Sequence, residues 1–491
     1  MAKRQDFYTL LGLTREASSD EIRQAYFKAA RHLHPDKNLA PGETEIFLDI
    51  KEAYDVLSNP KKRSKYDATL PPEMGQKSPI DLKIILSRES FLALDEPQIV
   101  YCIMEFSAPA GFEMHTEPPL NLCLVLDRST SMQGNNIDMV KATAIQIIRK
   151  LKPQDIFSVV AFNDRAETII PATRSMNLGK QEARVQMLQP SGGTEIFSGL
   201  ELGYNEIIHN VNRSQVNHII LLTDGRTYGD ENKCISLAQR ATEHGIGISG
   251  LGVGAEWNDN LLDQLASITG GSSTYISRSQ DIQRALLDKF NRLGKAYAEE
   301  TRLEFDALKG IELRYAFRLR PEAGSLSIEN PMMTGPIICD SSLKVLLEFV
   351  VQPETVQQPT VKFVNGKFSI ALIDSATPLL IPISLSCPVT DETPPEPPPG
   401  EIMDALSQLR LYRLQEQARL EVTAGDYDQA AEHLTRLATH LLAQGERVLA
   451  KTVLIEAENI QKRKSFSKQG GKEIKYGTRA LLNSGRSKDK Q

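Results

Sequence analysis

The sequence predicts a multidomain protein: an all-α N-terminal hairpin, a doubly wound α/β domain inserted in or flanked by an antiparallel β-sandwich, and a C-terminal α-helical domain. Three observations predict this architecture. The chain has 491 residues, more than one hydrophobic core usually serves. Apolar strand-like runs alternate with helical stretches over residues 118–296, which is typical of a mainly parallel sheet. The proline-rich stretch DETPPEPPPG, residues 391–400, separates the last strand-like runs from a helical C-terminal part.

Acidic and basic residues are nearly balanced in number along the chain. The formal net charge is -6, and both signs are interspersed, which disfavours a protein built around nucleic acid or an anionic membrane. No window offers about eighteen uninterrupted apolar residues, and the start MAKRQDFYTLLGL lacks the features of a signal peptide. We therefore expect a cytoplasmic protein that does not bind membranes.

The cysteines predict neither a zinc ribbon nor a disulfide framework. They are odd in number, far apart and never arranged as CxxC. Several lie in apolar runs such as LCLVL and IIC, so we expect buried thiols in a reducing compartment. The five positions are Cys102, Cys123, Cys234, Cys339 and Cys387.

Residues 1–70 predict a helical hairpin. The stretch SDEIRQAYFKAARHL, residues 19–33, places apolar side chains on one face, and Ser19 or Asp20 is available as the N-cap. A second helix is expected at residues 43–57, and SNPKKRSKYD begins a short basic third segment. Two antiparallel helices of this kind pack against each other.

The loop HPDKN lies at the tip of this hairpin. Pro35 ends the first helix, because the residue before a proline is pushed out of helical geometry. His34 and Asp36 therefore fall in the loop. The outer face of the preceding helix is basic and carries Arg23, Lys28, Arg31 and His32.

This stretch resembles the J-domain of DnaJ-type co-chaperones over residues 6–68, through YTLLGL, EIRQAY, HPDKN and IKEAYDVLSNPKKRSKYD. The resemblance implies docking on a DnaK-type heat-shock chaperone, whose ATP hydrolysis His34, Pro35 and Asp36 trigger. The residues fit this role, because a basic helix face steers toward an acidic groove and a proline-held loop presents one His and one carboxylate.

The match to the J-domain has two departures. Phe27 stands where the family usually has a basic residue, and Leu33 replaces the usual tyrosine. The alternative is that His34 and Asp36 are only a helix stop and a loop carboxylate. The chain also has no Gly/Phe-rich stretch and no four-CxxC zinc region, so client choice must come from elsewhere in the sequence.

A linker at residues 71–79 is followed by strand signals at 80–117, DLKIILSR and QIVYCIMEFSA. The α/β region, residues 118–296, then begins with LNLCLVLD, an apolar run suited to a strand buried on both faces. Further strand runs are IFSVVAF, HIILLTD and GISGLGVG, separated by helical stretches. In such sheets, ligands bind outside the carboxyl ends of the strands.

Oxygen-bearing side chains are expected at that edge of the sheet. DRSTS supplies Asp127, Ser129 and Ser131 directly after the first strand, SGGTE supplies Thr194, and LLTDG supplies Asp224. All are hard donors suited to Mg²⁺ or Mn²⁺. Because Mg²⁺ wants about six ligands and keeps waters readily, a carboxylate from another protein is able to fill an open position.

The arrangement resembles the von Willebrand factor type A domain and its metal-ion-dependent adhesion site, whose pattern is D-x-S-x-S, then a distant Thr and a distant Asp. Bacterial members look most similar. The resemblance implies that Ser129, Ser131 and Thr194 bind the metal directly or through water, while Asp127 and Asp224 set the charge and orient waters. Thr130 replaces a frequent glycine.

Other roles for these residues are weaker. Ser and Asp at strand-to-helix turns are often ordinary N-caps, although Thr194 and Asp224 in the right order favour a metal site. Nucleophilic hydrolysis by Ser129 or Ser131 lacks a G-x-S-x-G elbow and an evident base. The sequence has no G-K-[ST] loop to cradle phosphate.

Residues 297–390 predict an antiparallel sandwich with a hairpin at VKFVNGKFSIAL, and we expect strands of residues 80–117 to join it. After the linker at 391–400, the pattern of residues 401–463 predicts three helices. The tail, residues 464–491, is basic and is expected to be flexible and solvated. Contact with nucleic acid is disfavoured because stacking aromatics are nearly absent there.

Together these features predict a non-enzymatic adaptor. One module recruits and stimulates a DnaK-type chaperone, and the other binds a protein partner or client through a divalent metal and an acidic residue of that partner. A metal-dependent hydrolase or nuclease using Asp127 and Asp224 is the first alternative, although no general base or second acidic cluster accompanies them. A scaffold with a vestigial metal site is the second.

Overall fold

The computed structural model describes residues 7–11, 13, 17–33, 43–67, 79–109, 111–112, 114, 116–174, 177–212, 214–227, 229–373, 375, 377–391 and 397–483. The chain divides into two compact units, Met1–Ile80 and Asp81–Gln491, each of which is described by itself. The predicted linker at residues 71–79 lies almost wholly outside the described residues. In the described part, no helix combines the length and apolar character needed to cross a bilayer.

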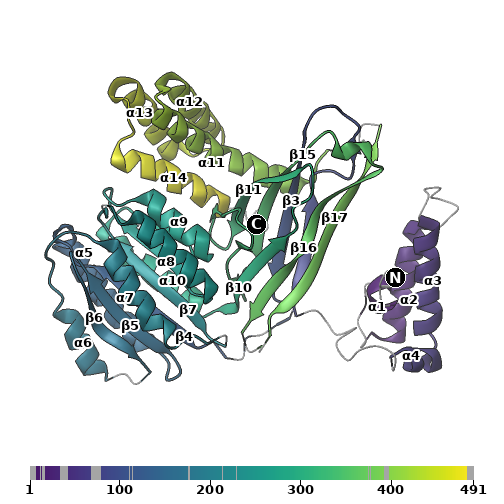
Figure 1. Ribbon diagram of the computed structural model, residues 1–491, viewed down its shortest axis with the longest axis horizontal. Helices are drawn as coiled ribbons and strands as arrows, with labels where there is room; N and C mark the ends of the chain where they lie inside the picture. Colours follow the sequence, from purple (N-terminus) through teal and green to yellow (C-terminus); the bar gives the residue numbers. More distant parts are fainter. Residues whose placement is uncertain are drawn as a thin grey trace. The chain divides into compact units, whose positions relative to one another are not determined.

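The N-terminal unit is a small helical domain with one core (Figure 1). Tyr8, Ile22 and Ala53 have no exposed surface, because the apolar faces of its two long helices meet. The first long helix is capped by Ser18 rather than by Ser19 or Asp20. The amide of Glu21 donates to Ser18 Oγ at 3.2 Å, and Glu21 Oε2 accepts from the Ser18 amide at 2.7 Å. The helices are α1 (Phe7–Leu11), α2 (Ser19–Leu33), α3 (Glu43–Leu57) and α4 (Pro60–Asp67).

The second unit contains a sandwich of two mainly antiparallel sheets. One has the strand order β1-β3-β15-β11-β12, and the other has the order β13-β10-β16-β17-β2 with β14 beside β10. The strands before the α/β domain therefore pair with strands far behind it: β3 pairs with β15 from Leu343↔Phe106 to Val351↔Gln98. The strands are β1 (Asp81–Leu86), β2 (Phe91–Leu92), β3 (Gln98–Ser107), β10 (Ala296–Phe305), β11 (Ile311–Arg320), β12 (Gly324–Ser325), β13 (Met332–Met333), β14 (Ile337–Ile338), β15 (Leu343–Val351), β16 (Thr360–Leu372) and β17 (Leu379–Thr390).

The α/β domain lies in the chain between β3 and β10 and has a six-stranded sheet of order β6-β5-β4-β7-β8-β9. All pairs are parallel except β5 with β6. Every residue of β4 and β7 is buried, as expected for strands covered on both faces. The strands are β4 (Leu120–Asp127), β5 (Ile156–Phe162), β6 (Ala166–Thr173), β7 (Val216–Thr223), β8 (Gly247–Val253) and β9 (Ser273–Ile276).

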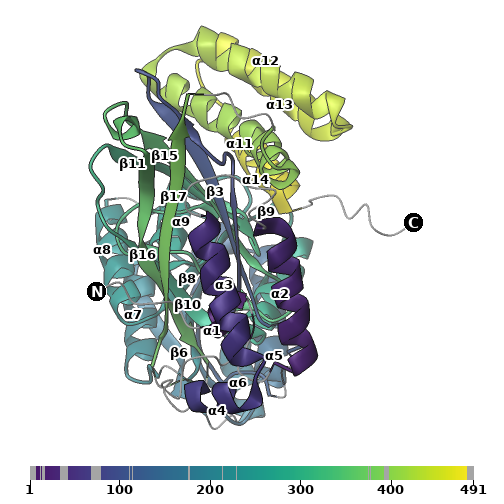
Figure 2. The ribbon, with the colours of Figure 1, turned by 90° about the vertical axis from the view of Figure 1, so that its right-hand side faces the viewer.

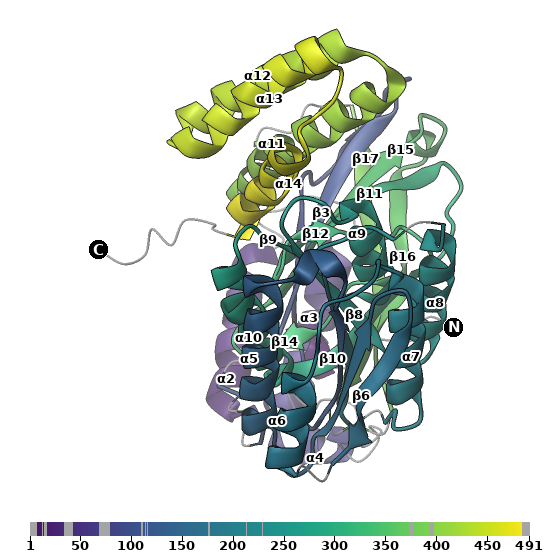
Figure 3. The same ribbon diagram turned by 90° about the vertical axis from the view of Figure 1, so that its left-hand side faces the viewer.

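Helices cover both faces of this sheet (Figures 1 and 3). Apolar side chains of α5, α6 and α10 form a core on one face, and those of α7, α8 and α9 form a core on the other. The helices are α5 (Asn135–Lys150), α6 (Leu178–Gln186), α7 (Ile196–Ile208), α8 (Glu231–Glu243), α9 (Asp259–Thr269) and α10 (Ile282–Leu293), with short 3-10 turns η1 (Thr130–Met132), η2 (Ser279–Asp281) and, in the sandwich, η3 (Thr355–Gln357).

Within the described residues, the C-terminal region has four helices, α11 (Gly400–Ala424), α12 (Tyr427–Ala443), α13 (Arg447–Arg463) and α14 (Lys468–Asn483). In Figure 2, α12 and α13 lie outermost, whereas α11 and α14 contact the sheets. Tyr412 of α11 packs with Phe317 of the sandwich, with ring centroids 5.1 Å apart. The helical region is thus bound to the rest of its unit.

The prediction of a flexible tail over residues 464–491 is wrong for most of its length. Residues 468–483 form α14, and its basic residues Lys472, Lys475 and Arg479 are buried at 3–6% exposure. They are buried because acidic residues of the α/β domain face them, a relation that the local composition does not reveal. The multidomain fold class itself is confirmed.

Candidate functional site

The strands β4 and β7 bring two carboxylates to one edge of the sheet. Asp127 ends β4, and Asp224 follows the last residue of its parallel neighbour β7. Asp127 is completely buried. Its Oδ1 accepts from the Ser129 amide at 2.7 Å, and its Oδ2 accepts from the Thr223 hydroxyl at 2.6 Å. Asp127 therefore holds the loop after β4 and the end of β7 together.

The two predicted serines connect the carboxylates. Ser129 Oγ lies 2.9 Å from Ser131 Oγ, and the Ser131 hydroxyl donates to Asp224 Oδ1 at 2.6 Å. Asn136 at the start of α5 donates to the other oxygen of Asp224 at 3.4 Å. Four of the five predicted metal residues thus form one hydrogen-bonded chain from β4 to β7.

Thr194 reaches the same edge from the loop before α7. A Cβ placed on Gly225 would lie 2.6 Å from Thr194 Oγ1, so only glycine beside Asp224 leaves room for this hydroxyl. Thr130 fastens the loop, because its amide and its hydroxyl donate to the Gly192 carbonyl at 3.1 and 3.0 Å. The departure from glycine at position 130 therefore adds a hydrogen bond to the site.

Burial is the largest influence on the electrostatics of the two carboxylates. Burial raises the pKa of Asp127, against hydrogen bonds from Thr223 and Ser129. Burial and, more weakly, the charge of Asp127 raise the pKa of Asp224 to about 6, although the hydrogen bond from Ser131 opposes the shift. No ion pair between described residues involves either group. Such a pair is stabilised by an added positive charge.

The donor set fits a hard divalent cation. It consists of two carboxylates and three hydroxyls, with no sulfur or imidazole among them, which suits Mg²⁺ or Mn²⁺ better than Zn²⁺. The described residues contain no group of three or more His, Cys, Asp or Glu side chains arranged to hold a metal, and this site itself has only two carboxylates, Asp127 and Asp224. A two-metal hydrolase would require a second cluster of carboxylates beside the first.

Sequence reasoning missed several supporting residues. Thr223, whose hydroxyl donates to Asp127, directly precedes Asp224 in LLTDG, so its place beside a predicted site residue could have indicated this role. Thr227 and Asp230 cap α7, since the Ile196 amide donates to Thr227 Oγ1 at 3.2 Å and the Phe197 amide donates to Asp230 Oδ2 at 2.9 Å. These two bonds tie the loop after β7 to the helix that follows Thr194.

The predicted chaperone-binding residues are described only in part. Arg23 is exposed on α2, and its guanidinium lies 5.8 Å from the centroid of the Phe27 ring, which is 56% exposed. His34, Pro35 and Asp36 lie outside the described residues, and so do the side chains of Lys28 and Arg31. The roles expected for these residues stay predictions.

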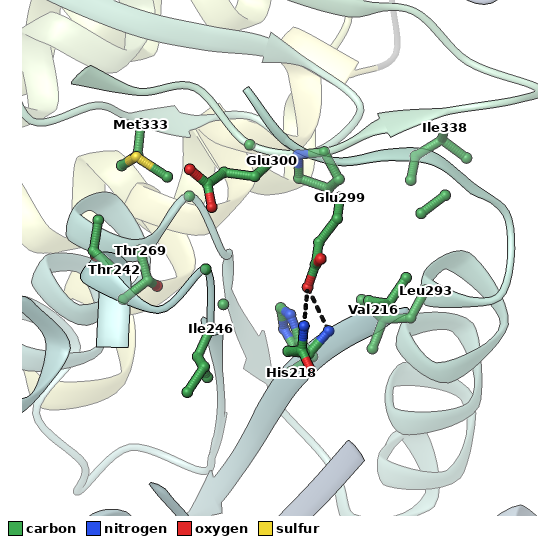
Figure 4. Close-up of a pocket in the computed structure, with 17 residues that line it drawn as sticks. Val216, His218, Thr242, Ile246, Thr269, Leu293, Glu299, Glu300, Met333 and Ile338 are labelled. Atoms are coloured by element: carbon green, nitrogen blue, oxygen red, sulfur yellow. Dashed lines mark hydrogen bonds between the residues drawn. The ribbon is translucent and has the colours of Figure 1, made fainter. Parts of the chain in front are cut away.

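A partly open cavity of about 30 Å³ lies near the opposite ends of the strands (Figure 4). Glu299 points into it and accepts from the Asn217 side chain at 3.1 Å. Burial raises the pKa of Glu299 well above its ordinary value. A space of this size holds about one water, and it is lined by β7 and β10, away from Asp127 and Asp224.

Three family models match separate parts of the chain. Residues 6–67 match the DnaJ domain, residues 121–291 match the von Willebrand factor type A domain, and residues 400–484 match the Sll0103-like C-terminal alpha-helical domain. The chain therefore carries these three domains in this order. The resemblances inferred from the sequence are confirmed for the first two.

Individual proteins match in the same pattern. Protein sll0103 of Synechocystis sp. is 28% identical over 332 residues, which cover 65% of this chain and 78% of that protein. The chaperone protein DnaJ of Roseiflexus sp. is 52% identical over 67 residues, which cover 14% of this chain and 18% of the chaperone. The likeness to that chaperone is thus confined to a small share of its length.

A solved structure shares the fold of most of the second unit. The von Willebrand factor type A protein from Catenulispora acidiphila superposes with a TM-score of 0.65 at 17% identity, covering 81% of this chain and 96% of that chain. The superposed part of this chain is longer than residues 121–291, which match the von Willebrand factor type A domain. The common fold therefore includes structure on both sides of that domain.

Proposed function

We propose that this chain, which joins a DnaJ domain to a von Willebrand factor type A domain, is a non-enzymatic cytoplasmic adaptor. In this proposal the DnaJ domain stimulates the ATPase of a DnaK-type chaperone. The von Willebrand factor type A domain binds a protein partner or client through a divalent metal. The observation that carries the second half is the hydrogen-bonded chain Asp127–Ser129–Ser131–Asp224 beside Thr194.

The roles at the metal site follow from the donors. The hydroxyls of Ser129, Ser131 and Thr194 hold Mg²⁺ or Mn²⁺ directly or through water, and Asp127 and Asp224 supply negative charge and orient waters. When bound, the ion supplies an open coordination position for a carboxylate oxygen of the partner. Because the hydroxyls are neutral and the two carboxylates act mainly through oriented waters, the ion keeps its attraction for a further oxygen anion at the open position, which favours an acidic partner.

The two modules act together through their covalent connection. A partner held by one domain experiences a raised effective concentration of any chaperone held by the other. The exposed Arg23 on α2 supports the chaperone half, since basic side chains on this face steer toward an acidic groove. The adaptor thereby delivers what it binds to the chaperone.

Calorimetric titration of the full chain with MgCl₂ or MnCl₂ tests the metal half. We expect uptake of one ion per chain, and none in a variant that combines Ser129→Ala with Ser131→Ala. Pull-down with and without chelator, using the same variant as control, then separates an active metal site from a scaffold with a vestigial one. Absence of divalent uptake by the unmodified chain contradicts the proposal.

ATP turnover by a purified DnaK-type chaperone tests the other half. We expect the full chain to raise turnover and a His34→Gln variant to lose this effect. Stimulation by the variant equal to that of the unmodified chain would show that the DnaJ domain acts in another way.

A further inference from the structure

The last helix of the described residues, α14, is fastened to the α/β domain by ion pairs. Lys475 Nζ lies 2.8 Å from Asp259 Oδ2 and 2.7 Å from Asp263 Oδ2. Arg479 pairs with Asp263 at 2.6 Å, and Arg419 of α11 pairs with Asp259 at 2.9 Å. Lys475, Arg479 and Asp259 are all less than 10% exposed. The position of α14 on α9 is therefore fixed by charge as well as by packing.

The first turns of α14 hold the turn that follows β8. Lys472 Nζ donates to the Ala255 carbonyl at 2.7 Å, and Lys468 pairs with the Glu256 carboxylate. Lys472 also lies 5.0 Å from the centroid of the buried Trp257 ring. The turn begins at Gly254, whose φ of +68° favours glycine. Three successive residues of this turn, 255–257, thus contact α14.

The same turn holds the loop of the candidate metal site. Arg226, two residues after Asp224, donates from Nε to the Glu256 carbonyl at 2.9 Å. The loop contains Gly225 and Gly229, the latter with φ of +82°, so its own backbone restrains it weakly. A continuous series of contacts therefore runs from Lys472 through residues 255–256 to Arg226 and Asp224.

We propose that Lys472 and Arg226 are positioning residues through which α14 holds the loop that carries Asp224 in its metal-binding arrangement. The helical domain then sets the affinity of the metal site, although none of its described residues contacts the donors. Because coupling between sites is reciprocal, metal binding also stabilises the docking of α14. The inference rests on the proposed function only where its test measures metal binding.

Metal titration of the full chain tests the coupling with the variants Arg226→Met and Lys472→Met and their combination. We expect each single variant to raise the Kd for Mn²⁺ about three- to tenfold. The Kd of the double variant should be no higher than that of the single variant with the higher Kd, because both replacements break the same series of contacts. Arg226→Lys, which keeps a donor for the Glu256 carbonyl, should recover part of the affinity.

Lys462→Met is the matched control. Lys462 is an exposed lysine of α13 that pairs with Glu458 at 3.2 Å and does not contact the turn. Its replacement should leave the Kd unchanged. Single variants whose Kd stays within twofold of the unmodified chain, or effects that add fully in the double variant, would overturn the inference.

Hydrogen exchange separates this inference from the proposed function. Without metal, the amides of residues 225–227 should exchange faster in Lys472→Met than in the unmodified chain, at equal global stability. Unchanged exchange overturns the positioning role even if metal binds. Faster exchange in a chain that takes up no divalent ion supports the positioning role and contradicts only the metal proposal.

Discussion

Two pairs of aspartates in the same α/β domain, all buried except the half-buried Asp263, have opposite surroundings. Asp259 and Asp263 on α9 face Lys475, Arg479 and Arg419. Burial raises the pKa of Asp259, but Lys475 and Arg419 outweigh it and leave the pKa at about 2. Asp127 and Asp224 face hydroxyls and each other, and their pKa values are raised. The first pair fastens a helix, whereas the second forms no ion pair with a described residue.

Breaking the first pair has the largest expected effect. Asp263→Ala leaves Lys475 and Arg479 buried with fewer partners, so we expect a loss of about 3–5 kcal/mol in the free energy of unfolding. Denaturant unfolding of the full chain measures it. Lys462→Ala, which removes an exposed ion pair, should cost less than about 1 kcal/mol. A similar small loss for Asp263→Ala would mean that the cluster is not needed for docking.

Metal binding at the second pair should have the next largest effect on stability. Saturating Mn²⁺, at about one hundred times its Kd, should stabilise the folded chain by about 2.7 kcal/mol. Thermal unfolding with and without metal measures the shift. The combined Ser129→Ala and Ser131→Ala variant should show no shift, and an equal shift in that variant would place the ion elsewhere.

The pH dependence of the two pairs should have opposite signs. The pKa of Asp259 is lowered from 3.8 to about 2, so its stabilising effect is present above pH 3.8 and is lost as pH falls toward 2. The pKa of Asp224 is raised from 3.8 to about 6, so without metal its contribution is greatest below pH 3.8 and is lost as pH rises toward 6.

Comparing each Asp→Asn variant with the unmodified chain measures these windows in chelator. The difference for Asp259→Asn should change by up to about 2 kcal/mol between pH 4 and 2, and that for Asp224→Asn by a similar amount between pH 4 and 6. If both differences changed in the same window, the two pairs would not differ in their charge environment.

The smallest effect is expected at Thr130, which supports the second pair without belonging to it. Thr130→Ala removes the hydroxyl that donates to Gly192, a neutral hydrogen bond that contributes about 0.5–1 kcal/mol. Calorimetry should show metal uptake preserved with a slightly higher Kd. Complete loss of uptake would make Thr130 a direct participant in the site.

The fold was predictable where local pattern and packing agree. The apolar runs of β4 and β7 indicated strands buried on both faces, and the helical periodicity of residues 401–463 corresponds to α11, α12 and α13. The meeting of Asp127 and Asp224 was predictable because the carboxyl ends of parallel strands lie at one edge of the sheet. The distance between these side chains depends on the register of β4 with β7. The sequence does not show this register directly and implies it only through the fold class.

The docking of α14 was not predictable from its own residues. Lys472, Lys475 and Arg479 look like a solvated basic tail until Asp259 and Asp263 are known to face them from more than 200 residues earlier. The fit of Thr194 against Gly225 was hidden for the same reason, since the two residues come from different loops. Contacts between distant segments of this kind leave no local periodicity.

The insertion of the α/β domain between β3 and β10 has a consequence for the order of synthesis. At the ribosome, β3 emerges long before β15, the strand with which it pairs from Phe106 to Gln98. Until then β1 and β3 remain an open hairpin with an apolar edge, which is a hazard for aggregation. The DnaJ domain precedes both strands, and its described contacts lie within residues 7–67, so it forms faster than a strand pairing that spans the inserted domain. A nascent chain therefore carries a DnaJ domain throughout the interval in which its own sandwich is unfinished.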